Sequence, residues 1–152
     1  GQRTIAAGYK EAPIYVNGQV VDGLGGGICQ ISSTLYNAVI YANLDIVTRS
    51  NHQFVPSYVT ASRDATVVYG STDFQFKNNR KYPIKIMCSV SGGVASVRIF
   101  GLKQDDDYDV EISSYITGQT STATYSEAYK ILKKNGKVVS KVLLSKDTYK
   151  RH

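Results

Sequence analysis

Three consecutive glycines, Gly25-Gly26-Gly27, stand directly before the one convincing helical pattern in the chain. Glycine tolerates positive φ and lets another backbone approach closely, so this run predicts a tight turn at the helix start. The pattern predicts an amphipathic helix from about Cys29 to Ala42. Its apolar positions recur at helical spacing: Ile31, Leu35, Ala38, Val39 and Ala42. The glycine turn would therefore deliver Cys29 to the first turn of a helix.

The rest of the chain has the patterns of β-strands and turns. Strands are expected at 45–50, 54–60, 64–70, 73–77, 83–90 and 94–100, and Asn17-Gly18 predicts a tight hairpin between 13–16 and 19–22. Longer strands are expected at 108–117, 122–132 and 137–144. We expect an α+β fold, with one main helix carrying the cysteine at its N-terminus, packed on a mostly antiparallel sheet with a C-terminal β-hairpin extension.

The acidic connector at 103–107 suggests a division into a domain at 1–103 and a β-hairpin appendage at 104–152. The formal charge of +6 favours anionic partners in general. The basic residues are scattered and do not interleave with aromatics, so no nucleic-acid partner is expected. No apolar stretch is long enough to span a membrane. Because the chain starts without Met, we expect a piece of a longer protein, with any targeting segment upstream.

The position of Cys29 suggests nucleophilic chemistry. The free N–H groups and the dipole at a helix N-terminus favour thiolate over thiol, and the same N–H groups could stabilise an oxyanion. Of the two histidines, His152 is terminal, which leaves His52 as the candidate base. Asp64 follows 12 residues later on the next expected strand, and adjacent strands could bring the two together. The order of cysteine, histidine and acid resembles the papain-like and NlpC-type arrangement.

Structural alternatives exist for each of these residues. Cys29 could be a buried cysteine after a glycine turn, His52 a surface histidine, and Asp64 a carboxylate paired with Arg63. Cys88 lies on the apolar face of an expected strand, which predicts a buried structural thiol. A Cys29–Cys88 disulfide would occupy the nucleophile.

A zinc site would need ligands at characteristic spacings. The candidates Cys29, His52, Asp64 and Cys88 include no pair with a zinc-type spacing. The run Asp105-Asp106-Asp107 lacks the pattern of a calcium loop and is expected to be a solvated connector. We therefore expect no metal and no cofactor.

Several longer motifs resemble the VanW domain family. They are Gly8–Pro13, Gly25–Ala38, Ser57-Tyr58-Val59, Arg63–Val67, Phe76–Asn79 and Tyr82-Pro83-Ile84. The tail, with Tyr129-Lys130, Lys134–Ser140 and Leu144-Ser145, resembles part of the five-glycine cell-wall domain that often follows VanW domains.

The VanW resemblance implies an extracellular protein of the cell envelope, tethered to the membrane through an upstream segment. It also implies a link to glycopeptide resistance and to L,D-transpeptidation of peptidoglycan stem peptides. In this interpretation Cys29 is the nucleophile, His52 the base and Asp64 the orienting acid, with Ser57 and Ser50 as weaker choices for the acid. The expected substrate contacts are Gly27, Gln30, Ser33, Tyr58 and Arg63.

Two other functions fit the same sequence. A cysteine endopeptidase would use the same site with water as the acceptor. A non-catalytic wall-binding module would use the positive charge to hold anionic cell-wall polymers.

Overall fold

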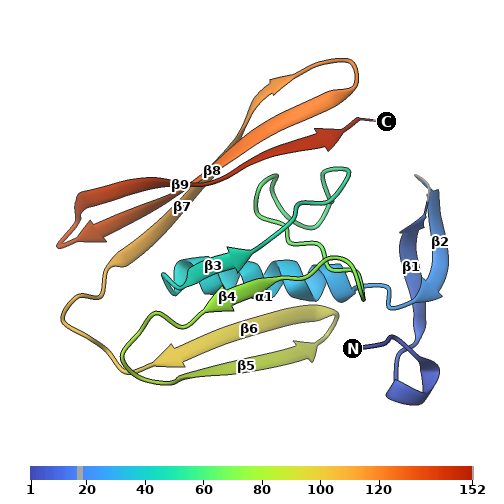
Figure 1. Ribbon diagram of the computed structural model, residues 1–152, viewed down its shortest axis with the longest axis horizontal. Coiled ribbons are helices and arrows are strands. Elements are labelled where there is room, and N and C mark those ends of the chain that lie inside the picture. Colours follow the sequence, from blue (N-terminus) through green and yellow to red (C-terminus); the bar gives the residue numbers. More distant parts are fainter. Residues whose placement is uncertain (17–18, 152) are drawn as a thin grey trace.

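The computed structural model describes residues 1–16 and 19–151, and about half of these residues lie in β-strands. Over that part of the chain, one α-helix accompanies four separate antiparallel sheets (Figure 1). The elements are η1 (Ile5–Ala7), β1 (Glu11–Val16), β2 (Gln19–Leu24), α1 (Ile28–Tyr41), β3 (Asp45–Thr48), β4 (Gln75–Lys77), β5 (Ile84–Ser91), β6 (Val94–Gly101), β7 (Asp109–Gln119), β8 (Ala123–Lys134) and β9 (Lys137–Lys150). No helix among the described residues is long and apolar enough to cross a membrane.

The expectation of an α+β fold is wrong, because the fold is mostly β and has no single large sheet under the helix. Strands pair as β1-β2, β3-β4, β5-β6 and β7-β8-β9. Two segments predicted as strands, 54–60 and 64–70, are loops with one isolated bridge between Val68 and Thr72. Without these segments, the middle of the chain cannot form a continuous sheet.

The expected helix is confirmed with its ends shifted by one residue. Gly27 is its N-cap with φ of 85°, and Gly25 has φ of 88°, so the turn does use the left-handed region that glycine favours. Gly26 lets the helix start lie close to the backbone of β1, because a Cβ at this position would lie 2.7 Å from the carbonyl oxygen of Ala12. The glycine turn thus places Cys29 in the first helical turn, and Gly26 packs against β1.

The buried face of α1 differs from the predicted apolar stripe. Ser33, Tyr36, Val39 and Ile40 are buried, whereas Ile31 is exposed. The helix is rotated because its inner face contacts the loop 49–67, and Ser33 forms hydrogen bonds with the backbone of Ala65 in that loop. Periodicity alone could not reveal a polar contact that determines the rotation.

A Gly26→Ala substitution is expected to destabilise the protein by about 1–3 kcal/mol, because the added methyl group overlaps backbone atoms of β1. Gly118→Ala is the matched control, since a Cβ at that position meets only Tyr125 at 4.0 Å. Urea unfolding of both variants measures the difference. Equal midpoints for the two variants would contradict the close approach at Gly26.

The C-terminal segment forms a three-stranded sheet rather than a simple hairpin extension. β8 pairs with both β7 and β9, and the β9 strand runs to Lys150, beyond its expected end. Ile112 of this sheet belongs to the same core cluster as Tyr36, Ile40 and Ala65, with Leu144 packed against it. Figure 1 shows α1 between this sheet and the β5-β6 hairpin. The division at residue 103 stays a prediction, but the two segments share a core.

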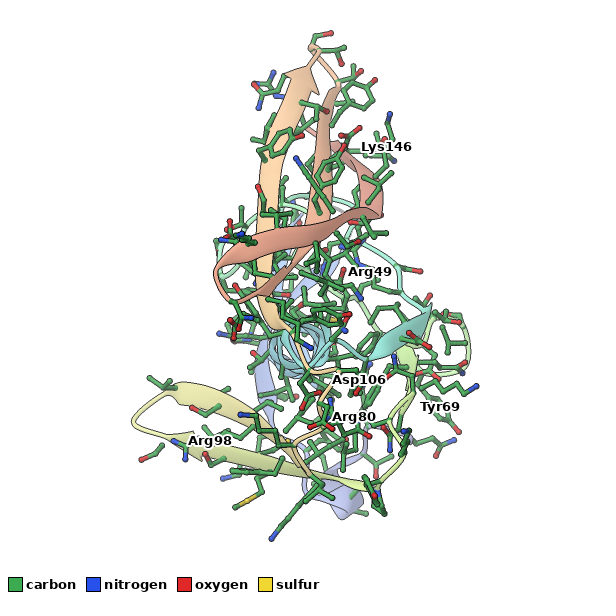
Figure 2. All side chains as sticks on the ribbon, turned by 90° about the vertical axis from the view of Figure 1, so that its left-hand side faces the viewer. Arg49, Tyr69, Arg80, Arg98, Asp106 and Lys146 are labelled. Atoms are coloured by element: carbon green, nitrogen blue, oxygen red, sulfur yellow. The ribbon has the colours of Figure 1, made fainter. Side chains whose placement is uncertain are left out.

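The β5-β6 hairpin lies largely in solvent. Its expected apolar face is exposed, with Val90 70% and Ile86 41% accessible, because no second layer of described residues covers it. Figure 2 shows the hairpin, labelled at Arg98, projecting to one side of the molecule, and β6 contacts α1. Cys88 is consequently an exposed free thiol, and the prediction of a buried structural cysteine is wrong.

The predicted Asn17-Gly18 turn and His152 lie outside the described residues. The strands on either side of that turn, β1 and β2, do pair antiparallel.

Candidate active site

The structure brings Cys29, His52 and Asp64 together at the start of α1. The carboxylate of Asp64 is fully buried, and its Oδ2 accepts hydrogen bonds from His52 at both the backbone N–H and ring Nδ1, each at 2.7 Å. The adjacent strands expected to join these residues do not exist. A loop that folds back on itself joins them instead, with the Thr66 N–H donating to the Ser50 carbonyl at 2.9 Å.

The other carboxylate oxygen of Asp64 is also occupied. Oδ1 accepts from Arg49 Nη2 at 2.9 Å and from the Tyr149 hydroxyl at 2.6 Å. Burial alone would raise the pKa of Asp64, but the hydrogen bonds from His52 and Tyr149 and the charge of Arg49 lower it below the ordinary value. Asp64 is therefore a fixed anion behind the imidazole of His52.

The Cys29 thiol also interacts with His52. Its direct hydrogen-bond partners are the Thr66 hydroxyl at 3.6 Å and the Val67 carbonyl at 3.5 Å. Burial opposes ionisation, yet the interaction with His52 and these two hydrogen bonds lower the pKa of Cys29 to about 7. Thiolate is thus a major form of this cysteine near neutral pH.

The pKa of His52 moves in the opposite direction. Burial would lower it, but the hydrogen bond to Asp64 and the interaction with Cys29, together with the negative charges of both groups, raise the pKa of His52 to about 9. Between about pH 7 and 9 the favoured state is therefore a Cys29 thiolate beside a His52 imidazolium. This ion pair is the activated state that a cysteine nucleophile requires.

The helix start supplies hydrogen-bond donors next to the sulfur. The backbone N–H groups of Cys29 and Gln30 belong to the first turn of α1 and have no acceptor within the described part of the chain. A carbonyl carbon attacked by the sulfur would place its oxygen near such donors. They are suited to stabilise an oxyanion.

A pocket of about 410 Å³ adjoins this helix face. It lies between the polar side of α1, the loop around Tyr58 and the turn of the β5-β6 hairpin. Its lining residues are Gln30, Ser33, Thr34, Asn37, Tyr58, Val59, Gly93, Val94 and Ala95. Three of the five expected substrate contacts, Gln30, Ser33 and Tyr58, are therefore in one pocket.

The expected substrate contacts differ in how free their polar groups are. The Tyr58 hydroxyl is 3.3 Å from His52 Nε2, and Ser33 Oγ is engaged by Ala65. Arg63 lies outside the pocket lining, but its Nε donates to Asn37 Oδ1 at 2.6 Å, and its guanidinium lies over the Tyr41 ring. Its two terminal nitrogens have no acceptor among the described residues. Gly27 forms the N-cap and contributes no side chain.

Sequence reasoning missed Arg49, Thr66 and Tyr149. Arg49 and Thr66 lie within a few residues of His52 and Asp64, so proximity in sequence was a usable signal for them. Tyr149 is 85 residues beyond Asp64 and had no such signal.

The structure also bears on the alternative contacts considered for Cys29, Cys88 and Asp64. Cys29 and Cys88 are both free, so they do not form a disulfide. Among the described residues, no three His, Cys, Asp or Glu side chains are placed to share a metal ion. Asp64 pairs with Arg49 rather than with Arg63.

Comparison with known proteins places the chain in a family. The family described as "VanW like protein" matches residues 1–100. A relative from Bacillus subtilis (strain 168), named "Uncharacterized protein YoaR", is 48% identical over 100 residues. That match covers 66% of this chain but 33% of the relative, so the chain spans about a third of that protein's length. No solved structure matches significantly. The five-glycine resemblance of the tail stays a prediction. From the family match, the chain belongs to the VanW-like family.

Proposed function

We propose that the protein is a cysteine acyltransferase that cross-links peptidoglycan stem peptides by L,D-transpeptidation. The observation that carries the proposal is the continuous arrangement of Cys29, His52 and Asp64 at a helix N-terminus beside an open pocket. The geometry supports acyl transfer through a thioester. Membership of the VanW-like family supports the cell-wall substrate only through the resemblance described above.

The reaction has two steps on one sulfur. The Cys29 thiolate attacks the carbonyl of the third stem residue, and the backbone N–H groups at the helix start stabilise the oxyanion. The C–N bond to the terminal D-alanine breaks, and His52 gives its proton to the leaving amine. The amine of a second stem then attacks the thioester while neutral His52 takes the amine proton, and Cys29 leaves as thiolate.

The pocket has the length needed for a short peptide. Gln30 and Asn37, which both line it, are seven residues apart on α1, which corresponds to about 10 Å along the helix axis. About three extended residues span the same distance at roughly 3.3 Å each. The pocket lining is polar on the helix side and includes Val59 and Val94 opposite, which suits a peptide backbone with small apolar side chains.

Arg63 is placed to hold a stem-peptide carboxylate at the far end of this helix face. Asn37 and Tyr41 fix its orientation, which leaves its terminal nitrogens available for a paired contact. Arg63→Gln is expected to raise KM for a tetrapeptide donor about 10- to 100-fold, the usual effect of losing a hydrogen bond to a charged group. Arg98→Gln on the exposed hairpin is the matched control. An unchanged KM in Arg63→Gln would exclude this role.

The products distinguish the three candidate functions. Purified protein supplied with disaccharide-tetrapeptides is expected to release D-alanine and to form dimers linked between third residues. Water is present at ~55 M, so transfer requires the pocket to hold the acceptor amine in attacking geometry. Tripeptide products without dimers would mean a hydrolase, and no product at all would favour a non-catalytic module that holds anionic wall polymers.

The location follows the substrate. We place the protein at the extracellular side of the cell envelope, tethered through a segment upstream of this chain. Protease accessibility of intact cells tests this location, because a protein inside the membrane would be protected.

A further inference from the structure

Strand β9 runs along the loop that carries His52. The Asn51 side-chain amide donates to the Thr148 carbonyl at 3.0 Å, and the Lys150 N–H donates to the Gln53 carbonyl at 2.7 Å. These two contacts lie on either side of His52 in the sequence. The backbone that carries the candidate base is therefore held to β9.

Tyr149 of the same strand reaches the carboxylate itself. Its side chain is fully buried, and its hydroxyl oxygen accepts from the Ser62 N–H at 2.7 Å. A backbone N–H can only donate, so the hydroxyl proton is free for the neighbour on its other side. That neighbour is Asp64 Oδ1 at 2.6 Å. Ser62 thus sets the direction in which Tyr149 donates.

A third contact from β9 passes through Arg49. Asp147 Oδ1 accepts from Arg49 Nη1 at 2.6 Å, while Arg49 Nε and Nη2 donate to the backbone carbonyl and the carboxylate of Asp64. Figure 2 shows Arg49 where the three-stranded sheet meets the rest of the chain. Asp147 therefore orients the guanidinium that neutralises Asp64.

We infer that β9 belongs to the catalytic unit and that Tyr149 is the positioning residue that holds Asp64 against His52. Tyr149 and Arg49 occupy Oδ1, which leaves Oδ2 to accept from the His52 ring. The inference rests on the proposed Cys29–His52–Asp64 site. The family match ends at residue 100, so the working unit extends at least 49 residues beyond that match.

Tyr149→Phe tests this role, because it removes the hydroxyl and keeps the ring. The readout is the pH dependence of Cys29 alkylation by iodoacetamide in a Cys88→Ser background, which needs no peptidoglycan substrate. Tyr129→Phe is the matched control, since its hydroxyl also donates to a carboxylate, Glu127, but on the outer face of the same sheet. The charged and titratable groups around the site are Cys29, Tyr36, Arg49, His52, Tyr58, Arg63, Asp64, Asp147 and Tyr149.

The expected result is an alkylation rate at pH 6 about three- to tenfold lower in Tyr149→Phe, because a less firmly held Asp64 supports the His52 imidazolium less well. The profile should move to higher pH, and Tyr129→Phe should match the parent. If Tyr149→Phe does not fold, Asp147→Asn gives the same test through Arg49 and leaves Tyr149 in place.

Two different failures can be distinguished. A parent-like profile in the folded variant overturns the role of β9 and leaves the proposed function intact. If the alkylation rate of Cys29 in the parent protein does not rise near pH 7, both the role of β9 and the proposed function are overturned, because no ion pair then exists for Tyr149 to support.

Discussion

Replacing His52 with alanine is expected to lower the rate of D-alanine release about 10²- to 10⁴-fold, the usual contribution of a general acid–base group. The loss has two sources. The Cys29 thiolate loses its cationic partner, and the imidazolium that protonates the leaving amine is removed. Asp64 keeps its contacts with Arg49 and Tyr149, so the variant should still fold.

Tyr58→Phe is the control for this experiment. It removes the other group near His52 Nε2 and leaves the imidazole in place, so we expect a loss of less than about tenfold. The assay follows D-alanine release with a melting curve for each variant. Near-parental turnover in a folded His52→Ala protein would place the base elsewhere.

The second large effect concerns the pH dependence of Cys29. In a Cys88→Ser background, its alkylation rate should rise through about pH 7. In His52→Ala the pH at which the alkylation rate rises should move toward 9.0, the ordinary pKa of the thiol. This shift lowers the thiolate fraction at pH 6 about 100-fold. A thiolate of higher pKa is intrinsically more nucleophilic, so the measured rate should fall about 10- to 100-fold. Identical profiles in the two proteins would show that His52 does not activate Cys29.

The pH dependence of the melting temperature would not reveal this ion pair, because the pKa shifts of Cys29 and His52 have opposite directions. The lowered pKa of Cys29 contributes stability that is lost as the pH falls through about 7. The raised pKa of His52 contributes stability that is present below 6.5 and is lost as the pH rises through about 9. In the folded protein Cys29 and His52 release their protons near pH 7 and 9, and in the unfolded chain they do so near pH 6.5 and 9.0. The folded and unfolded states therefore bind almost the same number of protons at each pH, and the free energy of unfolding barely changes with pH through this pair. Reactivity is therefore the informative readout.

The parts of the site that the sequence could predict depend on local signals. The glycine run and the helical periodicity placed Cys29 within the first turn of α1, where the structure has it. The scarcity of histidine points to His52, and the position of Asp64 on the next expected strand pairs it with His52, although the expected strands around them are loops. A loop held by side-chain hydrogen bonds has no periodic pattern, so its course could not be read from residue types.

The errors in fold prediction have a common physical origin in long-range packing. An apolar alternation in β5 predicted a covered face, but covering it requires a second layer, and the alternation carries no information on that layer. In the same way, nothing local to Tyr149 or Asp147 indicates that they contact Asp64 and Arg49. Only the folded arrangement joins the tail to the site.

The central claim is that Cys29 forms a covalent acyl intermediate, and intact-protein mass spectrometry tests it most directly. The protein is mixed with a disaccharide-tetrapeptide whose acceptor amine is blocked and is quenched in acid, which preserves a thioester. We expect a mass increase equal to the donor minus D-alanine, mapped to Cys29 and absent from Cys29→Ala. An unmodified protein after release of D-alanine, or an adduct that persists in Cys29→Ala, would contradict it.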